Sequence, residues 1–259
     1  MRASGTAGPL AWCGLLLVAA MWARAGAQGV CVRGPHHKAT PGPEKELFQE
    51  CAPWEPRACC SAGTSFSAHL DGSQLYNFSF SHCGLLPPAC QQHFARAACF
   101  YECSPNLGPW VRKVPPLSTL PQIPGGGQRV LAVPLCREDC EKWWQDCRTA
   151  LTCRPHWHSG GWHWSRGRSR CPVGAPCRPF PAIFPTPALL CAGVWDGAFR
   201  ASPEPRASGR CLRKWFQPGL ANPNDDVARR LADPAVPRTA PPMPLAALLP
   251  LMLALLLRP

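Results

Sequence analysis

The segment Cys136-Arg-Glu-Asp-Cys-Glu-Lys-Trp-Trp-Gln-Asp-Cys147 repeats thiol and indole side chains at helical spacing. On an α-helix, positions i, i+4, i+7, i+8 and i+11 share one face. Charged residues occupy the opposite face, so the predicted helix is amphipathic and its thiol-rich face must be buried. Such a helix would cross-link the rest of the domain. The residues of its buried face are Cys136, Cys140, Trp143, Trp144 and Cys147.

The chain has 259 residues and 17 cysteines. Residues 1–27 combine Arg2, an apolar run and the small residues Ala25-Gly26-Ala27, which is typical of a cleaved secretory signal. The alternative is a retained membrane anchor, for which the apolar run is short. Cleavage removes Cys13, and the even number that remains in an exported chain predicts a disulfide framework. Zinc is the weaker alternative, because helical i, i+4 spacing already explains the paired cysteines.

The C-terminal residues 232–259 contain small residues, a proline-rich spacer and an apolar end. This order is typical of a signal for a glycosylphosphatidylinositol (GPI) anchor, and the alternative is an apolar tail on a secreted protein. The sequence therefore predicts a signal peptide at 1–27, an ectodomain at 28–231 and an anchor signal at 232–259. We expect a monomer on the extracellular face of the plasma membrane.

The formal net charge is +12, and without the four arginines Arg2, Arg24, Arg238 and Arg258 of the two signal segments it is +8. In an exported domain this charge favours acidic partners. No basic run exceeds two residues, so nucleic acid is not an expected partner. No metal or cofactor is expected.

Further elements follow from periodicity and from proline. We expect helices at 43–51, 88–103 and 222–231, and a strand at 76–80 where aromatic residues alternate. The proline density around Phe180–Pro187 argues against a helix or a central strand there. Asn77 begins the sequon Asn77-Phe-Ser79, which predicts a glycan unless the sequon occurs by chance. The expected fold class is α+β: a helix-rich, disulfide-stapled domain with short strands and long irregular loops.

Three motifs resemble the folate receptor family: Tyr101-Glu-Cys-Ser-Pro-Asn-Leu-Gly-Pro-Trp110, Val133-Pro-Leu-Cys136 with the cysteine-rich helix, and Ser208-Gly-Arg-Cys-Leu-Arg-Lys-Trp-Phe216. The resemblance extends from about Cys31 to Leu231. The pairs that it implies are Cys31–Cys59, Cys51–Cys99, Cys60–Cys103, Cys83–Cys177, Cys90–Cys147, Cys136–Cys211, Cys140–Cys191 and Cys153–Cys171.

The resemblance also implies an aromatic pocket that has lost its polar contacts to a pterin. Ala97 stands where the family has a pterin-binding Asp, Gly125–Gly127 replace a loop Trp and Arg, and Ala198-Phe199 replace Ser-Tyr. Losing one buried charged partner costs about 2–5 kcal/mol, so folate binding should be lost. The tryptophans after Cys153 have a second interpretation as a packed lid. The remnant pocket comprises Tyr76, Phe78, Ala97, Tyr101, Arg129, His158, Trp162, Trp164, Trp195, Ala198 and Phe199.

The same departures resemble the egg-surface branch of the family, which binds the sperm protein Izumo. Shared segments include Leu75-Tyr-Asn-Phe-Ser79 and His82-Cys-Gly-Leu-Leu86. This implies partner contacts at Gln49, Phe66, Leu85 and Leu86, and the alternative is that these residues pack the core. An adhesion receptor is thus the leading hypothesis and a vitamin carrier the second. A hydrolase is disfavoured, because His158 and His163 have no acid or nucleophile at motif spacing.

Overall fold

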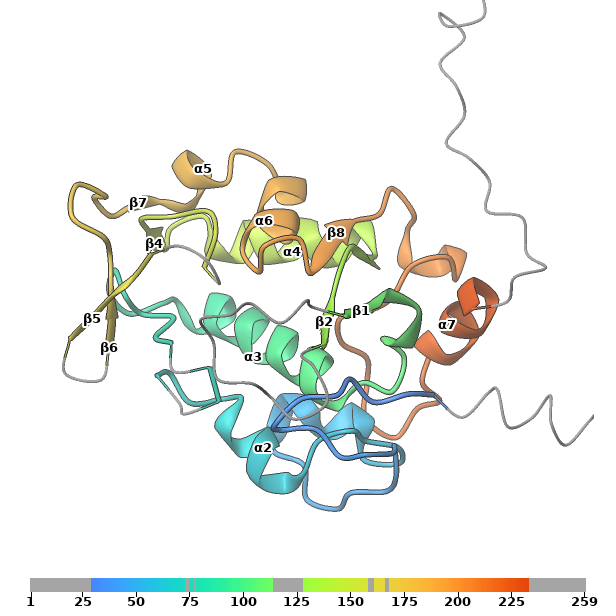
Figure 1. The fold of residues 1–259 in the computed structure, drawn as a ribbon. Coiled ribbons are helices and arrows are strands. Elements are labelled where there is room, and N and C mark those ends of the chain that lie inside the picture. Colours follow the sequence, from blue (N-terminus) through green and yellow to red (C-terminus); the bar gives the residue numbers. More distant parts are fainter. Residues whose placement is uncertain are drawn as a thin grey trace, which may run out of the picture.

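The computed structural model describes residues 29–72, 75–76, 78–113, 128–157, 161–165 and 168–232. Two helices form its centre: α3 (Pro88–Cys103) and α4 (Arg137–Cys147), which pack together and are joined by the disulfide Cys90–Cys147. The 3-10 helix η1 (Gln49–Trp54) packs on α3, and α6 (Pro187–Gly193) packs on α4. Figure 1 shows this stack, with α2 (Ala62–Ser67) at one side of α3 and α5 (Phe180–Ile183) at the far side of α4.

The strands are short and form four separate two-stranded sheets among the described residues. Three pairs are antiparallel: β1 (Val111–Lys113) with β2 (Gln128–Val130), β4 (Leu151–Thr152) with β7 (Arg178–Pro179), and β5 (His163–Ser165) with β6 (Arg168–Arg170). The fourth, β3 (Val133–Leu135) with β8 (Phe199–Ala201), is parallel. Short helices η2 (Gly108–Trp110), η3 (Arg206–Ser208) and α7 (Asn224–Ala232) complete the fold. The predicted helix-rich α+β fold class is confirmed.

Helix α4 buries the face that its sequence predicts. Cys140, Trp143 and Cys147 are at most 1% exposed, and Cys136 caps the helix in a fully buried position. Trp144 is only half-buried, and its indole Nε1 donates to the Phe184 carbonyl at 2.7 Å. The helix thus contacts several neighbours at once, as a cross-linking element should.

Eight disulfides tie the elements together, and each contributes about 2–4 kcal/mol by restricting the unfolded chain. They link segments 18 to 94 residues apart in sequence. The structure contains the same eight pairs that the resemblance implies, Cys31–Cys59 through Cys153–Cys171.

The core contains a lysine, Lys214, whose burial no sequence pattern predicts. The Lys214 ammonium lies 3.6 Å from the centre of the Trp143 ring and 3.1 Å from His93 Nδ1. Burial lowers the pKa of Lys214 well below its ordinary value, and burial with the nearby lysine lowers the pKa of His93 to about 3. His93 Nε2 in turn contacts Asp146 at 2.8 Å, so this buried polar chain ends on a carboxylate at the surface of α4.

The helix predicted at 43–51 is wrong. Glu46 and Gln49 adopt positive φ values of 64° and 36°, which break a right-handed helix, and the first helical turn begins only at Gln49. Tertiary hydrogen bonds hold this shape: the Phe48 amide donates to Ser65 Oγ at 2.9 Å, and the Glu50 amide to His69 Nε2 at 3.0 Å. These partners lie outside the segment, so local propensity could not reveal them.

Two further expectations need correction. The described residues of 76–80 form turns and irregular backbone instead of a strand, because Asp71 accepts hydrogen bonds from the Phe80 amide and Ser79 Oγ. The proline-dense segment does form helices, α5 and α6. Each has a proline in its first turn, where the missing amide proton costs nothing.

The remaining helix predictions agree with the structure. Helix α3 has the predicted bounds, and α7 has Asp225 and Asp226 in its first turn and two arginines in its last turn, as the helix dipole favours. Asn77, the loop 114–127 and nearly all of the two predicted signal segments lie outside the described residues. Within the described part of the chain, no helix has the length and apolar character needed to cross a membrane.

Candidate functional site: an aromatic pocket beside helix α3

A cavity of about 390 Å³ opens between α3, the β1–β2 hairpin and the segment that leads into β8. Its volume is in the range of small-molecule sites. Helix α3 contributes one face, β2 contributes two residues, and the remaining walls come from chain segments held by disulfides. The lining residues are Tyr76, Phe78, Ala97, Ala98, Tyr101, Arg129, Val130, Trp157, Trp162, Trp195, Ala198 and Phe199.

Aromatic rings form most of the wall, and they hold one another in place. Phe78 packs edge-to-face on Trp162 with ring centres 5.0 Å apart, and Tyr76 lies 5.9 Å from Trp195. Trp162 Nε1 donates to the Trp157 carbonyl at 2.8 Å. Trp157 itself stacks on the buried Phe94 at 4.8 Å, which ties the pocket to the core. The walls are therefore preformed and suit a flat, apolar ligand.

Charge is almost absent from this lining. Arg129 is the one charged residue among the lining residues that the structure describes, and its guanidinium donates to the Asp196 carbonyl at 2.7 Å. No carboxylate lines the described cavity. Ala97, 1% exposed, presents only a methyl group where the resemblance places an aspartate. The amino-pyrimidinone edge of a pterin would therefore have no anionic partner on this wall.

Two acids adjoin the lining residues in sequence: Glu102, which is buried, and Asp196, which is half-buried. Glu102 accepts a hydrogen bond from the Tyr76 hydroxyl at 2.9 Å, and its second oxygen lies 3.4 Å from His37 Nε2. Asp196 contacts His156 Nδ1 at 3.0 Å. Neither lines the cavity, so Tyr76 stands between the ligand space and the Glu102 carboxylate.

Glu102 and its neighbours favour their neutral forms. Burial raises the pKa of Glu102 to about 7, although the Tyr76 hydrogen bond opposes this rise. Burial also lowers the pKa of His37 and raises the pKa of Tyr76 well above its ordinary value. The contact between His37 and Glu102 is therefore not a strong ion pair near neutral pH.

All but two of the predicted pocket residues line the cavity. His158 and the side chain of Trp164 lie outside the described residues, so the structure does not place them. Sequence reasoning omitted Ala98, Val130 and Trp157. Ala98 and Val130 are neighbours of residues that were predicted, and Trp157 belongs to the tryptophan-rich turn for which both a pocket and a lid were considered.

The predicted partner contacts lie on the outside of the domain. Leu85 is 94% exposed in the turn before α3, and Phe66 is 49% exposed on α2, where its ring packs edge-to-face on Phe48 at 5.2 Å. Gln49 is exposed at the start of η1. Leu86 differs, since it is half-buried and packs against the core. The core-packing alternative therefore fits Leu86 but not Leu85.

Two groups of side chains have the spacing of metal ligands: His82 with Cys83, Cys153 and Cys171, and His69 with Cys51 and Cys99. Every cysteine in them is oxidised in a disulfide. Zinc requires thiolates, so neither group is a metal site in this oxidised state.

An aromatic pocket in a disulfide-stapled domain defines a protein that works by binding. Its sequence matches the folate receptor family over residues 30–213. It is 50% identical to human folate receptor alpha over 208 residues, which cover 80% of this chain and 78% of that receptor. Human folate receptor gamma is 49% identical over 80% of this chain and 81% of its own length. The chain belongs to the folate receptor family. It is therefore a binding protein and not an enzyme.

A more distant relative marks the breadth of the similarity. The riboflavin-binding protein of the emu, Dromaius novaehollandiae, is 29% identical over 71% of this chain and 70% of its own length. The names of these relatives refer to folate and to riboflavin.

Proposed function

We propose that this chain is a GPI-anchored receptor on the egg surface that binds sperm Izumo and mediates adhesion before fusion, with folate binding lost. The observation that carries the proposal is the described pocket lining, which has no carboxylate to pair with a pterin. The sequence is similar to the egg-surface receptor Juno, which resembles a folate receptor with the same alanine at this position.

The outer surface supports recognition of a protein. Interface anchors are exposed apolar side chains with a polar surround, and few of them carry most of the binding energy. Leu85 and Phe66 are apolar side chains that lie at the surface instead of in the core. Gln49 and Glu50 supply polar groups beside α2, and the Glu50 amide contacts His69 on the turn after that helix.

The decisive experiment compares two ligands on one protein preparation. Purified protein should bind the Izumo ectodomain in a surface-based binding assay, while titration with folate should leave tryptophan fluorescence unchanged at nanomolar concentrations. Trp157, Trp162 and Trp195 line the cavity, so a bound pterin would quench them. Nanomolar quenching without Izumo binding would reject the proposal.

A vitamin carrier is the second candidate. It is favoured by the preformed cavity and by relatives named for folate and riboflavin. Such a carrier would use the aromatic walls and Arg129 without the missing aspartate. Micromolar or tighter binding of a folate or flavin, with no binding of Izumo, would support this function.

A further inference from the structure

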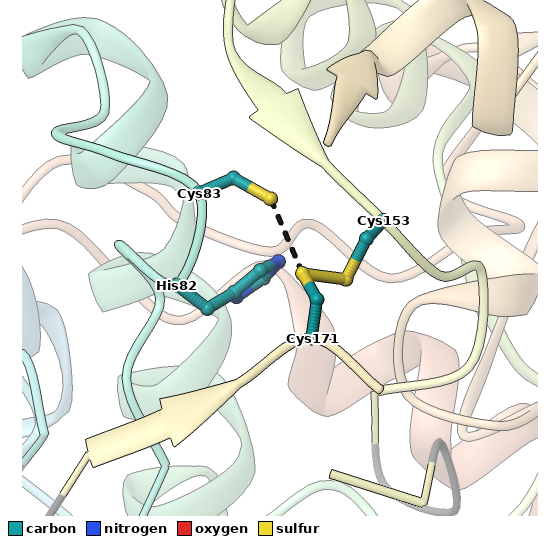
Figure 2. A group of neighbouring side chains, drawn as sticks. All are labelled: His82, Cys83, Cys153 and Cys171. Carbon is teal, nitrogen blue, oxygen red and sulfur yellow. Dashed lines mark hydrogen bonds between the residues drawn. A yellow bond between two sulfur atoms is a disulfide. The ribbon is translucent and has the colours of Figure 1, made fainter. Parts of the chain in front are cut away.

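Two disulfides, Cys83–Cys177 and Cys153–Cys171, lie in direct contact. Figure 2 shows Cys83 beside the Cys153–Cys171 disulfide. Cys83 Sγ is 3.4 Å from Cys171 Sγ, along the dashed line of the figure, and Cys171 Sγ is 3.8 Å from Cys177 Sγ. All four sulfurs are oxidised and carry no proton, so these are sulfur–sulfur contacts. The four cysteines thus form a cluster in which one sulfur can reach more than one partner.

Exposure sets this cluster apart from the rest of the framework. The twelve cysteines of the other six disulfides are all at most 4% exposed. In the cluster, Cys177 is exposed and Cys83 and Cys171 are half-buried, while Cys153 is 7% exposed. Exchange requires a thiolate to reach a disulfide sulfur, and exposed disulfides are the labile ones. A dissolved thiol therefore meets Cys177 first.

Three arginines adjoin the cluster. Arg154, Arg170 and Arg178 each neighbour one of its cysteines in sequence, all three are exposed, and none forms an ion pair with a described residue. The sequence has no acidic residue between Asp146 and Asp196. Cations attract anionic thiols and stabilise thiolates.

Asp71, an acid from another segment, already accepts hydrogen bonds from its own neighbours. Asp71 accepts hydrogen bonds from Ser79 Oγ at 3.0 Å and from the Phe80 amide. His82, beside the cluster, contacts the Ser79 carbonyl and Thr152 Oγ1 through its two ring nitrogens. The local charge around the cluster is therefore positive.

We propose that this cluster is a thiol–disulfide exchange site for small anionic thiols. The thiolate attacks Cys177 Sγ and forms a mixed disulfide, which releases Cys83 as a thiolate. Cys83 then attacks Cys171 Sγ, 3.4 Å away, forms Cys83–Cys171 and releases Cys153 as a thiolate. Cys153 displaces the external thiol from Cys177. The net change is a re-pairing to Cys83–Cys171 and Cys153–Cys177, with no net oxidation or reduction and with the thiol regenerated.

The re-paired form would alter the turn that carries Leu85. Cys83 lies two residues before Leu85, and its bond would move from Cys177, just before β7, to Cys171, just after β6. Exchange would thus change the proposed partner surface. This consequence depends on the proposed function, whereas the exchange itself does not.

Disulfide mapping of the native protein tests the exchange. The oxidised full chain is incubated with glutathione without denaturant, quenched with acid and an alkylating agent, and mapped by peptide mass spectrometry. We expect glutathionyl-Cys177 and the Cys83–Cys171 linkage to form at least about tenfold faster than thiols appear from the six buried disulfides. Equal rates for all disulfides, or opening without Cys83–Cys171, would overturn the proposal. Izumo binding is measured on the same samples, so that a failure of the exchange proposal can be told from a failure of the proposed function.

A variant traps the central step without any external thiol. Cys177→Ser leaves Cys83 unpaired, and we expect Cys83–Cys171 with Cys153 free in a large fraction of the folded protein. Cys136→Ser is the control, because the Cys211 sulfur that it leaves unpaired contacts the backbone oxygens of Glu204 and Pro205. There the free thiol should stay at Cys211. A thiol that remains at Cys83 in Cys177→Ser would contradict the mechanism.

The preference for anionic thiols has its own test. Replacing Arg154, Arg170 and Arg178 by Gln should slow glutathione about tenfold and slow mercaptoethanol, which has no carboxylates, much less. Arg229→Gln on α7, which Figure 1 places at the opposite end of the molecule from β5 and β6, is the matched control. Equal slowing of both thiols would contradict the role of charge.

Discussion

The aromatic pocket and the outer surface at Phe66 and Leu85 use apolar side chains in opposite ways. In the pocket, Trp157 and Phe78 are buried and locked by neighbouring rings, but the wall offers no carboxylate among its described residues. On the outside, Leu85 is 94% exposed and supports no packing. The pocket is thus preformed but has no carboxylate among its described lining residues, while Leu85 contributes no packing and Phe66 packs its ring on Phe48. The proposed loss of pterin binding in the pocket and the proposed partner binding on the outer surface can be tested separately by mutation.

The largest effect is expected at the pocket wall, where Glu102 is buried behind Tyr76. Its pKa is raised from 4.5 to about 7, so the folded state binds the proton more tightly than the unfolded chain. Glu102 therefore contributes about 3 kcal/mol to the free energy of unfolding at low pH. This contribution is fully present below pH 4.5 and is lost as the pH rises through 7. In Glu102→Gln the free energy of unfolding should not show this fall between pH 5 and pH 8. Urea unfolding with intact disulfides at the two pH values measures it.

Identical pH dependence in the wild type and Glu102→Gln would show that Glu102 is ionised in the folded protein. A buried anion beside Tyr76 would then weaken the contrast between an uncharged pocket and a functional exterior. Glu141→Gln, on the exposed face of α4, is the control.

The next effect concerns the outer surface. Changing Phe66 and Leu85 together to Asp should weaken Izumo binding by about a hundredfold, because charged groups replace two apolar anchors. Leu85 is exposed and Phe66 is about half exposed, so unfolding stability should fall by no more than about 1–2 kcal/mol, most of it from the lost Phe66–Phe48 contact. Surface-based binding kinetics and urea unfolding measure the two results. Leu220→Asp, at another exposed leucine, is the control, and unchanged Izumo binding in the double variant would reject these anchors.

A gain of function inside the pocket should be smaller. Ala97→Asp places a carboxylate on the cavity wall, and we expect folate affinity to rise at least about tenfold while Izumo affinity is unchanged. Ala98→Asp is the matched control on the adjacent lining residue. Fluorescence titration measures the change. If neither variant improves folate binding, the loss of the pterin site has a further cause elsewhere in the wall.

The smallest effect distinguishes two adjacent leucines. Leu86 packs against the core and Leu85 does not. Leu86→Ala should therefore cost about 1–2 kcal/mol of unfolding free energy, and Leu85→Ala less than about 0.5 kcal/mol. Urea unfolding midpoints provide the comparison. Equal losses would mean that Leu85 packs in the folded protein, which would remove it as an exposed anchor.

Prediction succeeded where the pattern is local or the resemblance specific. Helical spacing gave α3 and α4, because one buried face repeats every 3.6 residues. The resemblance gave most of the pocket lining and eight disulfide pairs that spacing alone leaves open. Prediction failed at 43–51 and 76–80, where Ser65, His69 and Asp71 bind backbone groups and override local propensity. Such partners are distant in sequence and leave no periodic signal.

The sequence alone establishes the 17 cysteines, the amphipathic central helix and the alanine at position 97, because composition and periodicity are properties of the chain itself. Folding establishes the rest: Glu102 lies behind Tyr76 instead of in the cavity, and Leu85 is exposed while Leu86 is not. It also brings Cys83 within 3.4 Å of Cys171, 88 residues away. Contacts between distant segments depend on how the helices and loops pack, which no local pattern encodes.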